Sequence, residues 1–212
     1  FDGAFNAAED LLEEIEQLSP EHEEIFLQRA NICSKQKDHP QAIEQLIKAL
    51  DVTEEPVEVW SLIGMEYLFL EDYIKAKDFF LKCVSENSMD YQSLYNLLYC
   101  YDQLEENIEA INTLNDILET NPYSEVAWHQ LGKLYTKINK QEEALSAFEF
   151  AIISDDQFTG AYIEKGKLLE KLGRINLALE NYQYALDIND PNAFVHHRMG
   201  ECHLKLGNDN LA

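Results

Sequence analysis

The sequence has few residues that break helices and few that carry positive charge. Eight Gly and five Pro occur among 212 residues, and no stretch is rich in Gly, Pro or Ser, so nothing predicts an interdomain linker. Only 16 Lys and Arg stand against 40 Asp and Glu, which gives a formal net charge of −24. Such a chain repels phosphate backbones and anionic lipid. Nucleic acid and membrane surfaces are therefore not expected as partners.

Long apolar runs and paired cysteines are also missing. No apolar run approaches the roughly 20 residues of a membrane-spanning helix, and the first residues lack the order of a signal peptide. The cysteines are widely spaced and include no CxxC pair; they are Cys33, Cys83, Cys100 and Cys202. We expect small buried hydrophobic residues at these positions. Reduced thiols fit a cytoplasmic protein, although four cysteines can also pair in an oxidising compartment.

Motifs of catalysis and of cofactor binding are absent from the sequence. It contains no GxSxG turn, phosphate-binding glycine loop, HExxH motif or dinucleotide fingerprint. One cluster of potential metal ligands occurs, comprising His196, His197, Cys202 and His203. Its spacing is poor, because on a helix His197 points about 100° away from His196. We predict that the chain is not an enzyme and holds neither a cofactor nor a metal ion.

What the sequence does contain is a repeat of 34 residues. Alanine occupies one series of positions without exception: Ala8, Ala42, Ala76, Ala110, Ala144, Ala178 and Ala212. Glycine recurs in a second series at Gly64, Gly132, Gly166 and Gly200, where Ala30 and Leu98 fill the two other places. Small residues at constant spacing indicate helices that cross too closely for larger side chains.

Larger apolar residues recur at the same interval, and the sequence predicts that they form the core. One column is Leu12, Leu46, Phe80, Leu114, Phe148 and Tyr182; the other is Leu70, Leu104, Ile138, Leu172 and Leu206. The apolar spacing within each unit predicts two helices. Gly173 and Gly207 lie between the helices of their units, and Pro20, Pro122 and Pro191 lie between units.

One segment reproduces the pattern of a known family with its spacing intact, namely Trp128, Leu131, Gly132, Tyr135, Ala144 and Phe148. The chain thus resembles the tetratricopeptide repeat family, and the resemblance covers its whole length. Leu98 departs from it by replacing the usual Gly, and Ser88 and Asp156 stand where Pro is frequent. The resemblance implies an all-α fold, a right-handed α-solenoid of antiparallel helix pairs.

The repeat phase predicts a single solenoid over residues 1–212. Complete repeats are expected at 23–56, 57–90, 91–124, 125–158 and 159–192. Residues 1–22 are expected to form the second helix of a partial repeat, and 193–212 to start a further one, so the chain is expected to be a fragment. Because such open ends leave apolar helix faces uncovered, end-to-end or dimeric self-association is expected.

The resemblance implies that exposed residues of the first helices line a concave groove. Its candidate residues in this chain are Asn31, Met65, Tyr95, Tyr99, His129, Lys133, Lys167 and His197, and Glu170 occupies an equivalent place. Tyr95 and Tyr99 share one helical face and offer contact area at little cost in entropy; the alternative is that they pack against neighbouring helices. The basic residues suit an acidic segment or a C-terminal carboxylate, unless they are merely solvated.

The chaperone-binding relatives in this family clamp a carboxylate with Lys, Asn and Arg, and this chain lacks that set. Leu27 stands one turn before Asn31, where the clamp needs Lys. The predicted function is a protein interaction scaffold that binds a peptide or a partner helix in the groove. The alternative is a docking or regulatory domain of a larger signalling protein or enzyme.

Overall fold

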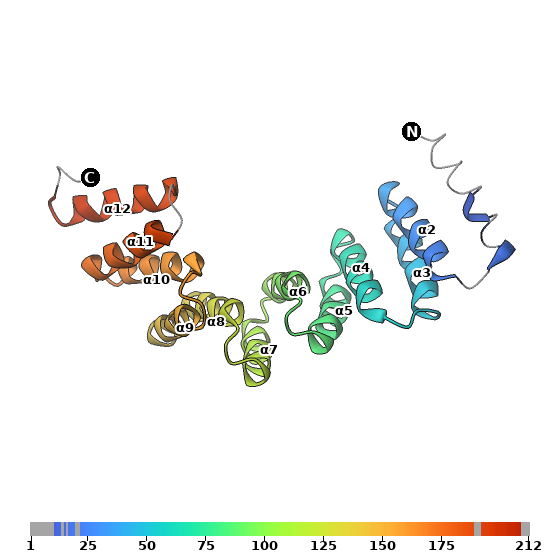
Figure 1. The fold of residues 1–212 in the computed structure, drawn as a ribbon, viewed down its shortest axis with the longest axis horizontal. Helices are drawn as coiled ribbons and strands as arrows, with labels where there is room; N and C mark the ends of the chain where they lie inside the picture. Colours follow the sequence, from blue (N-terminus) through green and yellow to red (C-terminus); the bar gives the residue numbers. More distant parts are fainter. Residues whose placement is uncertain (1–10, 14, 16, 20–21, 189–191, 209–212) are drawn as a thin grey trace. The chain divides into compact units, whose positions relative to one another are not determined.

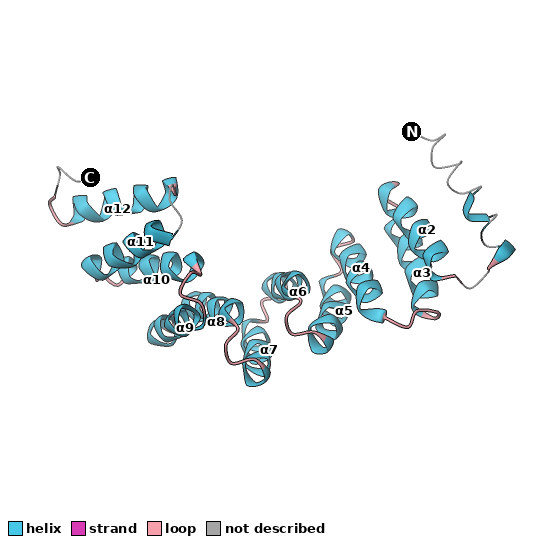
Figure 2. Ribbon diagram, in the orientation of Figure 1, coloured by secondary structure: helices cyan, strands magenta, loops and turns pink. Residues whose placement is uncertain are grey.

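The structure of the chain is a computed structural model that describes residues 11–13, 15, 17–19, 22–188 and 192–208. Among these residues the regular structure is entirely helical (Figures 1 and 2). The predicted all-α helical-repeat fold is therefore confirmed. Ala8, Ala212, Pro20 and Pro191 lie outside the described residues. The chain divides into two compact units, Phe1–Glu106 and Asn107–Ala212.

The first unit consists of helices that pair along the chain. Helix α2 (Glu23–Lys35) packs on α3 (His39–Leu50), and α4 (Pro56–Phe69) packs on α5 (Tyr73–Glu86). Helix α6 (Tyr91–Gln103) follows and contacts α5. A buried cluster joins the pairs, formed by Ala30, Leu46, Ala49, Val59 and Ile63.

The second unit continues the same arrangement. It begins with α7 (Asn107–Thr120), which contacts α8 (Glu125–Lys137); α8 pairs with α9 (Gln141–Ser154), and α10 (Thr159–Lys171) pairs with α11 (Ile175–Ile188). Helix α12 (Ala193–Lys205) packs on α11 and inserts Val195 and Cys202 into the core. In the described part of the chain, no helix combines the length and the apolar character needed to cross a membrane.

The corners that follow α2, α4, α6, α8, α10 and α12 have the same backbone geometry. One residue per corner has a left-handed backbone with φ between 58° and 74°, at Lys37, Glu71, Glu105, Asn139, Gly173 and Gly207. The next residue donates its N–H back to the preceding helix, as Asp72 does to the Tyr67 carbonyl at 3.0 Å. This is the Schellman motif. Asp72 also caps α5 by accepting the Lys75 N–H. The predicted placement of Gly173 between helices is confirmed; Gly207 follows α12, and the helix expected after it lies outside the described residues.

The glycine series provides room for an aromatic ring of the paired helix. A Cβ placed on Gly64 would lie 2.8 Å from the ring of Phe80, and one on Gly132 would lie 2.5 Å from the ring of Phe148. Gly166 has the same relation to Tyr182, at 2.6 Å. The alanine series is equally restricted, because its described members are 0–1% exposed: Ala42, Ala76, Ala110, Ala144 and Ala178. The predicted close helix contacts are confirmed.

The two predicted core columns differ in burial. Every member of the column from Leu12 to Tyr182 is buried. In the other column, Leu70 is 41% and Leu206 38% exposed, so the prediction that both belong to the core is wrong. These residues are the C-caps of α4 and α12, at helix ends where the neighbouring turn covers only part of the side chain. Cys83, Cys100 and Cys202 are buried as predicted, whereas Cys33 is only half-buried; all four are free thiols.

Candidate functional site

Four of the predicted groove residues lie in the first unit, and we call them the first-unit face: Asn31, Met65, Tyr95 and Tyr99. Asn31 is exposed on α2, and Met65 is half-buried on α4. Tyr95 and Tyr99 are 44% and 49% exposed on α6. The structure links α4 and α6 at this face, because the Asn96 amide donates to the Met65 sulfur at 3.4 Å. None of the four side chains carries a charge at neutral pH.

The two tyrosines of the first-unit face differ in their support. The ring of Tyr99 contacts Tyr73 of α5 edge to face, with centroids 6.0 Å apart. Such a contact orients the ring while about half of Tyr99 stays open to solvent. Tyr95 lies one turn earlier on α6, beside Asn96, whose amide oxygen accepts a hydrogen bond from Gln92 at 3.5 Å. The face therefore presents two aromatic rings beside side-chain amides that form hydrogen bonds.

The other four predicted groove residues lie in the second unit: His129, Lys133, Lys167 and His197. Lys133 is exposed. Lys167 donates to the Glu164 carboxylate at 2.7 Å and lies 4.8 Å above the ring of Phe194. His197 is exposed, and its Nε2 is 3.6 Å from Glu201. We call these four residues the basic strip. Because Glu164 offsets the charge of Lys167, the strip carries less uncompensated positive charge than the sequence predicts.

His129 is the most deeply placed of these residues. Its ring centroid is 5.2 Å from that of Phe158 and 6.0 Å from that of Phe148. Both ring nitrogens are buried without a hydrogen-bond partner among the described residues. Burial and the nearby Lys133 lower the pKa of His129 from 6.5 to about 4. The imidazole is therefore neutral at physiological pH and adds no charge to the strip.

The pKa of His129 makes stability depend on pH. Between pH 6.5 and about 4 the unfolded chain binds the proton more readily than the folded chain. The free energy of unfolding therefore decreases as the pH is lowered through this window. We expect a loss of about 2 kcal/mol between about pH 7.5 and about pH 5. His129→Phe should remove this loss. It should also raise the free energy of unfolding at neutral pH by about 1 kcal/mol, because two unpaired buried nitrogens disappear.

Urea unfolding at both pH values measures this effect. His197→Gln is the matched control, because His197 is exposed and its replacement should leave the pH dependence as in the wild type. Equal pH dependence in the wild type and in His129→Phe would contradict the assignment to His129.

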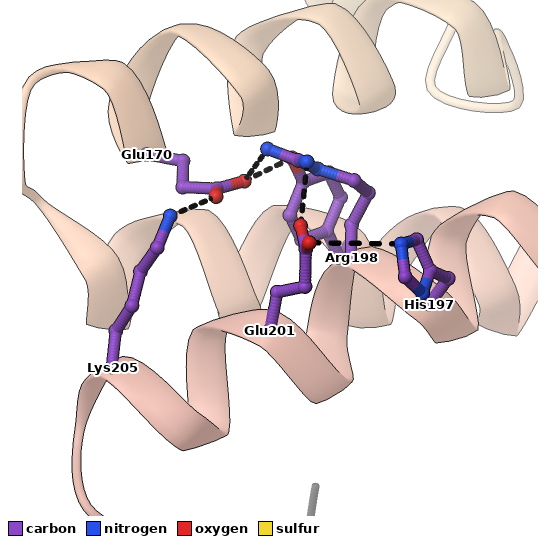
Figure 3. A network of polar contacts seen from close by, with 6 residues as sticks. Glu170, His197, Arg198, Glu201 and Lys205 are labelled. Atoms are coloured by element: carbon purple, nitrogen blue, oxygen red, sulfur yellow. Dashed lines mark hydrogen bonds and ion pairs between the residues drawn. The ribbon is translucent and has the colours of Figure 1, made fainter.

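Glu170 is the residue whose place differs most from the prediction. The family position puts it among the groove residues, yet only 2% of its side chain is exposed. Its carboxylate accepts hydrogen bonds from Arg198 and Lys205 of α12 at 2.5 Å each, and from the Tyr182 hydroxyl at 3.1 Å. Figure 3 shows Glu170 pointing from α10 toward these cations of α12. The prediction that Glu170 faces a groove is wrong, because α12 covers it.

The cations around Glu170 decide its ionisation. Burial alone would raise the pKa of this carboxyl, but hydrogen bonds from Lys205 and Arg198 outweigh burial and lower it. Arg198 also donates to Glu201 at 2.6 Å (Figure 3). The carboxylate, the guanidinium and the ammonium group thus form a compensated network that joins α10 to α12 rather than a free anion site.

Metal binding finds no support in this part of the molecule. Within the described ranges, no group of three or more His, Cys, Asp or Glu side chains is placed to hold a metal ion. Cys202 is buried in the core of the second unit, while His197 is exposed. The helix geometry thus separates these two members of the only candidate cluster in the sequence.

Comparison with known proteins adds two family matches. The model of the ChAPs (Chs5p-Arf1p-binding proteins) family matches residues 9–152. The tetratricopeptide repeat model matches residues 159–192, the same bounds as one of the predicted repeats. The two matches lie side by side along the sequence and together extend over most of it.

Similar individual proteins include a curated relative and two solved structures. Anaphase-promoting complex subunit 3 of Schizosaccharomyces pombe is 27% identical over 127 residues, which are 60% of this chain and 19% of that protein. A tetratricopeptide repeat protein from Parabacteroides merdae has a TM-score of 0.67 at 16% identity, covering 89% of this chain and 75% of that one. YrrB, described as a TPR protein with an unusual peptide-binding site, has a TM-score of 0.57 at 23% identity. The match covers 87% of this chain and 94% of YrrB.

Proposed function

Because this chain belongs to the ChAPs (Chs5p-Arf1p-binding proteins) family and is a tetratricopeptide repeat protein, we propose that it is an interaction scaffold that binds a peptide segment of a partner protein. The segment lies on the exposed side chains of the first helices, with the first-unit face as its main contact. We propose no reaction for the chain.

The observation that carries this proposal is the pair Tyr95 and Tyr99. Both are large, about half exposed, and one turn apart on α6. Tyrosine is enriched among the residues that dominate binding energy at protein interfaces, since its ring offers apolar area and its hydroxyl a polar contact. Met65 adds an adaptable apolar side chain from α4. These side chains suit a partly apolar peptide segment.

The family name gives the class of partner further support. It describes binding to two proteins, Chs5p and Arf1p, and YrrB, which has a similar fold, is a TPR protein with a peptide-binding site. A protein ligand rather than a small molecule is consistent with both. Chs5p and Arf1p are thus the first partners to test with this chain.

Removing the two rings tests the proposal. We expect Tyr95→Ala/Tyr99→Ala to weaken binding of Chs5p or Arf1p, whichever binds the wild-type chain, by at least about tenfold, because two anchors are lost. Isothermal titration calorimetry with the purified full chain measures this. Tyr95→Phe/Tyr99→Phe should retain most of the affinity, since it keeps the rings.

Tyr123→Ala is the matched control for the anchor variant. Tyr123 is 75% exposed and lies in the link between α7 and α8, so its removal should leave the affinity within about twofold of the wild type. Unchanged affinity of the Tyr95→Ala/Tyr99→Ala protein, with its fold intact by circular dichroism, would argue against the first-unit face as the binding site.

A second candidate function is a docking or regulatory region within a longer protein. The chain spans about a fifth of the length of the fission-yeast relative it matches, and that relative continues well beyond the matched segment. On this view the scaffold recruits a partner to a function located elsewhere in the polypeptide. Sequencing the full reading frame tests this proposal directly, since a catalytic domain joined to the repeats would support it.

A further inference from the structure

A groove of about 540 Å³ lies in the second unit, among helices α9, α10 and α11. It is lined mainly by the second helices of two pairs, α9 and α11, which each pack on α10. None of the predicted groove residues contributes to its lining. The groove is therefore distinct from the candidate residues on the first helices.

Aliphatic side chains form part of the lining of this groove, beside polar ones. Leu145 and Leu169 are buried at its base, 8% and 3% exposed. Ile153 and Leu177 rise along its sides and are 68% and 47% exposed. Exposed aliphatic side chains that gather around a hollow are typical of a protein contact site, whereas scattered ones are not.

Two tyrosines complete the wall of the groove. The rings of Tyr162 and Tyr184 lie 5.7 Å apart between centroids, and Tyr184 is 49% exposed. Burial and the carboxylates of Asp156 and Asp155 raise the pKa of Tyr162. Two carboxylates thus lie near this aromatic pair, an arrangement that favours a cation above the rings.

The rim of the groove is predominantly acidic. Glu142, Glu149 and Glu180 line it, against Lys165 and Arg174. The two cations are already engaged, since Arg174 is 3.0 Å from Glu142 and Lys165 is 3.6 Å from Glu149. Glu180 is exposed and adds a negative charge that neither Lys165 nor Arg174 pairs with. The three glutamates, Asp155 and Asp156 outnumber the two cations, so the surroundings of the groove carry a net negative charge.

We propose that this groove between α9 and α11 is a second docking site, which takes an amphipathic helical segment of a partner protein. Apolar side chains of the segment fill the space over Leu145 and Leu169, and its Lys or Arg side chains meet the rim carboxylates and the tyrosine rings. The acidic rim selects a basic segment over an acidic one, because like charges at the edge of an interface oppose association. The site does not depend on the first-unit face.

Two matched synthetic peptides test the docking site. Both are short amphipathic helices with leucine on one face, and the other face carries lysine in one peptide and glutamate in the other. We expect the lysine peptide to bind the full chain at least about tenfold more tightly than the glutamate peptide. Methyl NMR should show the largest shifts at Ile153, Leu177 and Leu145.

Serine variants distinguish the groove from general attraction to an acidic protein. Ile153→Ser/Leu177→Ser should lower the affinity for the lysine peptide by at least about tenfold. The control Ile74→Ser/Ile108→Ser replaces two isoleucines of similar exposure, 61% and 58%, on other helices, and should leave binding within about twofold. Equal binding to both double variants, shifts centred on other residues, or no binding of the lysine peptide would overturn the proposal. Tyr95→Ala/Tyr99→Ala should not alter this binding.

Discussion

Gly132→Ala is expected to lower the free energy of unfolding by about 2 to 3 kcal/mol, although it adds a single methyl group to a helix. The new Cβ would lie 2.5 Å from one ring carbon of Phe148 and 2.6 Å from another. Phe148 is 1% exposed in the core of the second unit, so its ring cannot move aside without displacing neighbours. Overpacking of this kind costs about 1 to 3 kcal/mol, and urea unfolding followed by circular dichroism measures it.

Gly160→Ala is the matched control for this substitution. Gly160 also lies in a helix, but a Cβ there would be no closer than 3.4 Å to its neighbours, which is ordinary contact. Alanine at this position should be neutral or should stabilise by up to about 1 kcal/mol, because it restricts the unfolded chain. Equal destabilisation by Gly132→Ala and Gly160→Ala would contradict the argument from the Phe148 ring.

The chain itself suggests a rescue for Gly132→Ala. In the first unit, Ala30 and Leu46 occupy the places that Gly132 and Phe148 hold in the second, and both are buried in one cluster. Adding Phe148→Leu to Gly132→Ala copies that pair. We expect the double variant to be less destabilised than the sum of the two single variants, by about 1 kcal/mol or more.

Glu170→Ala is the second substitution with a large expected effect, a loss of about 3 kcal/mol. Removing one partner of a buried ion pair leaves the others uncompensated, here Arg198, Lys205 and the Tyr182 hydroxyl. We place the loss at the low end of the usual range of about 3 to 5 kcal/mol, because Arg198 and Lys205 are 29% and 51% exposed and can regain water.

The effect of Glu170→Ala should concentrate on α12. Hydrogen exchange is expected to accelerate in α12, which the network attaches to α10, and to change little in α8 and α9. Glu201→Ala is the control, since Glu201 contacts the same Arg198 but is 39% exposed; it should cost less than about 1 kcal/mol. Uniform acceleration of exchange across the second unit would contradict a local role for Glu170.

Acid should weaken the same network. Because the folded state lowers the pKa of Glu170 below its ordinary value of 4.5, the carboxylate contributes stability above that value. This contribution is lost as the pH falls further, once the folded carboxylate takes up a proton. The effect of Glu170 thus lies at lower pH than that of His129, whose loss begins at 6.5.

Packing between paired helices could be predicted from the sequence because it repeats. Gly132 and Ala144 each have counterparts one repeat away, so a steric requirement that holds in every pair appears as a fixed residue type. The structure confirms the resulting contact of Gly132 with Phe148. Leu70 and Leu206 repeat as faithfully but end their helices, and periodicity alone does not distinguish a core position from a helix end.

Contacts specific to one repeat could not be found in this way. Glu170 meets Arg198 and Lys205 at sequence separations of 28 and 35 residues, and Arg174 meets Glu142 at 32. A search for opposite charges separated by about one repeat would have suggested both pairs, since consecutive repeats place such positions side by side. It would not have shown that Glu170 is buried, which depends on how α12 covers it.

The candidate groove residues illustrate the same limit. The family position correctly indicated exposure for Tyr95 and Tyr99, which are 44% and 49% exposed, but not the contact of Tyr99 with Tyr73 of α5. It gave no information on His129, which neighbouring aromatic rings enclose. Whether a position binds a partner or fills a space depends on the size of the residues around it, and these differ between repeats.

The corner within each helix pair determines where the chain can change in length. Every described corner comprises three residues, such as 70–72 and 172–174, held by one left-handed residue and its hydrogen bonds. An inserted residue there would break these hydrogen bonds and the close packing of the two helices that they join. The links between pairs already differ in length, because 51–55 has one residue more than 87–90, 121–124 and 155–158. Insertions and deletions among relatives should therefore accumulate in these links.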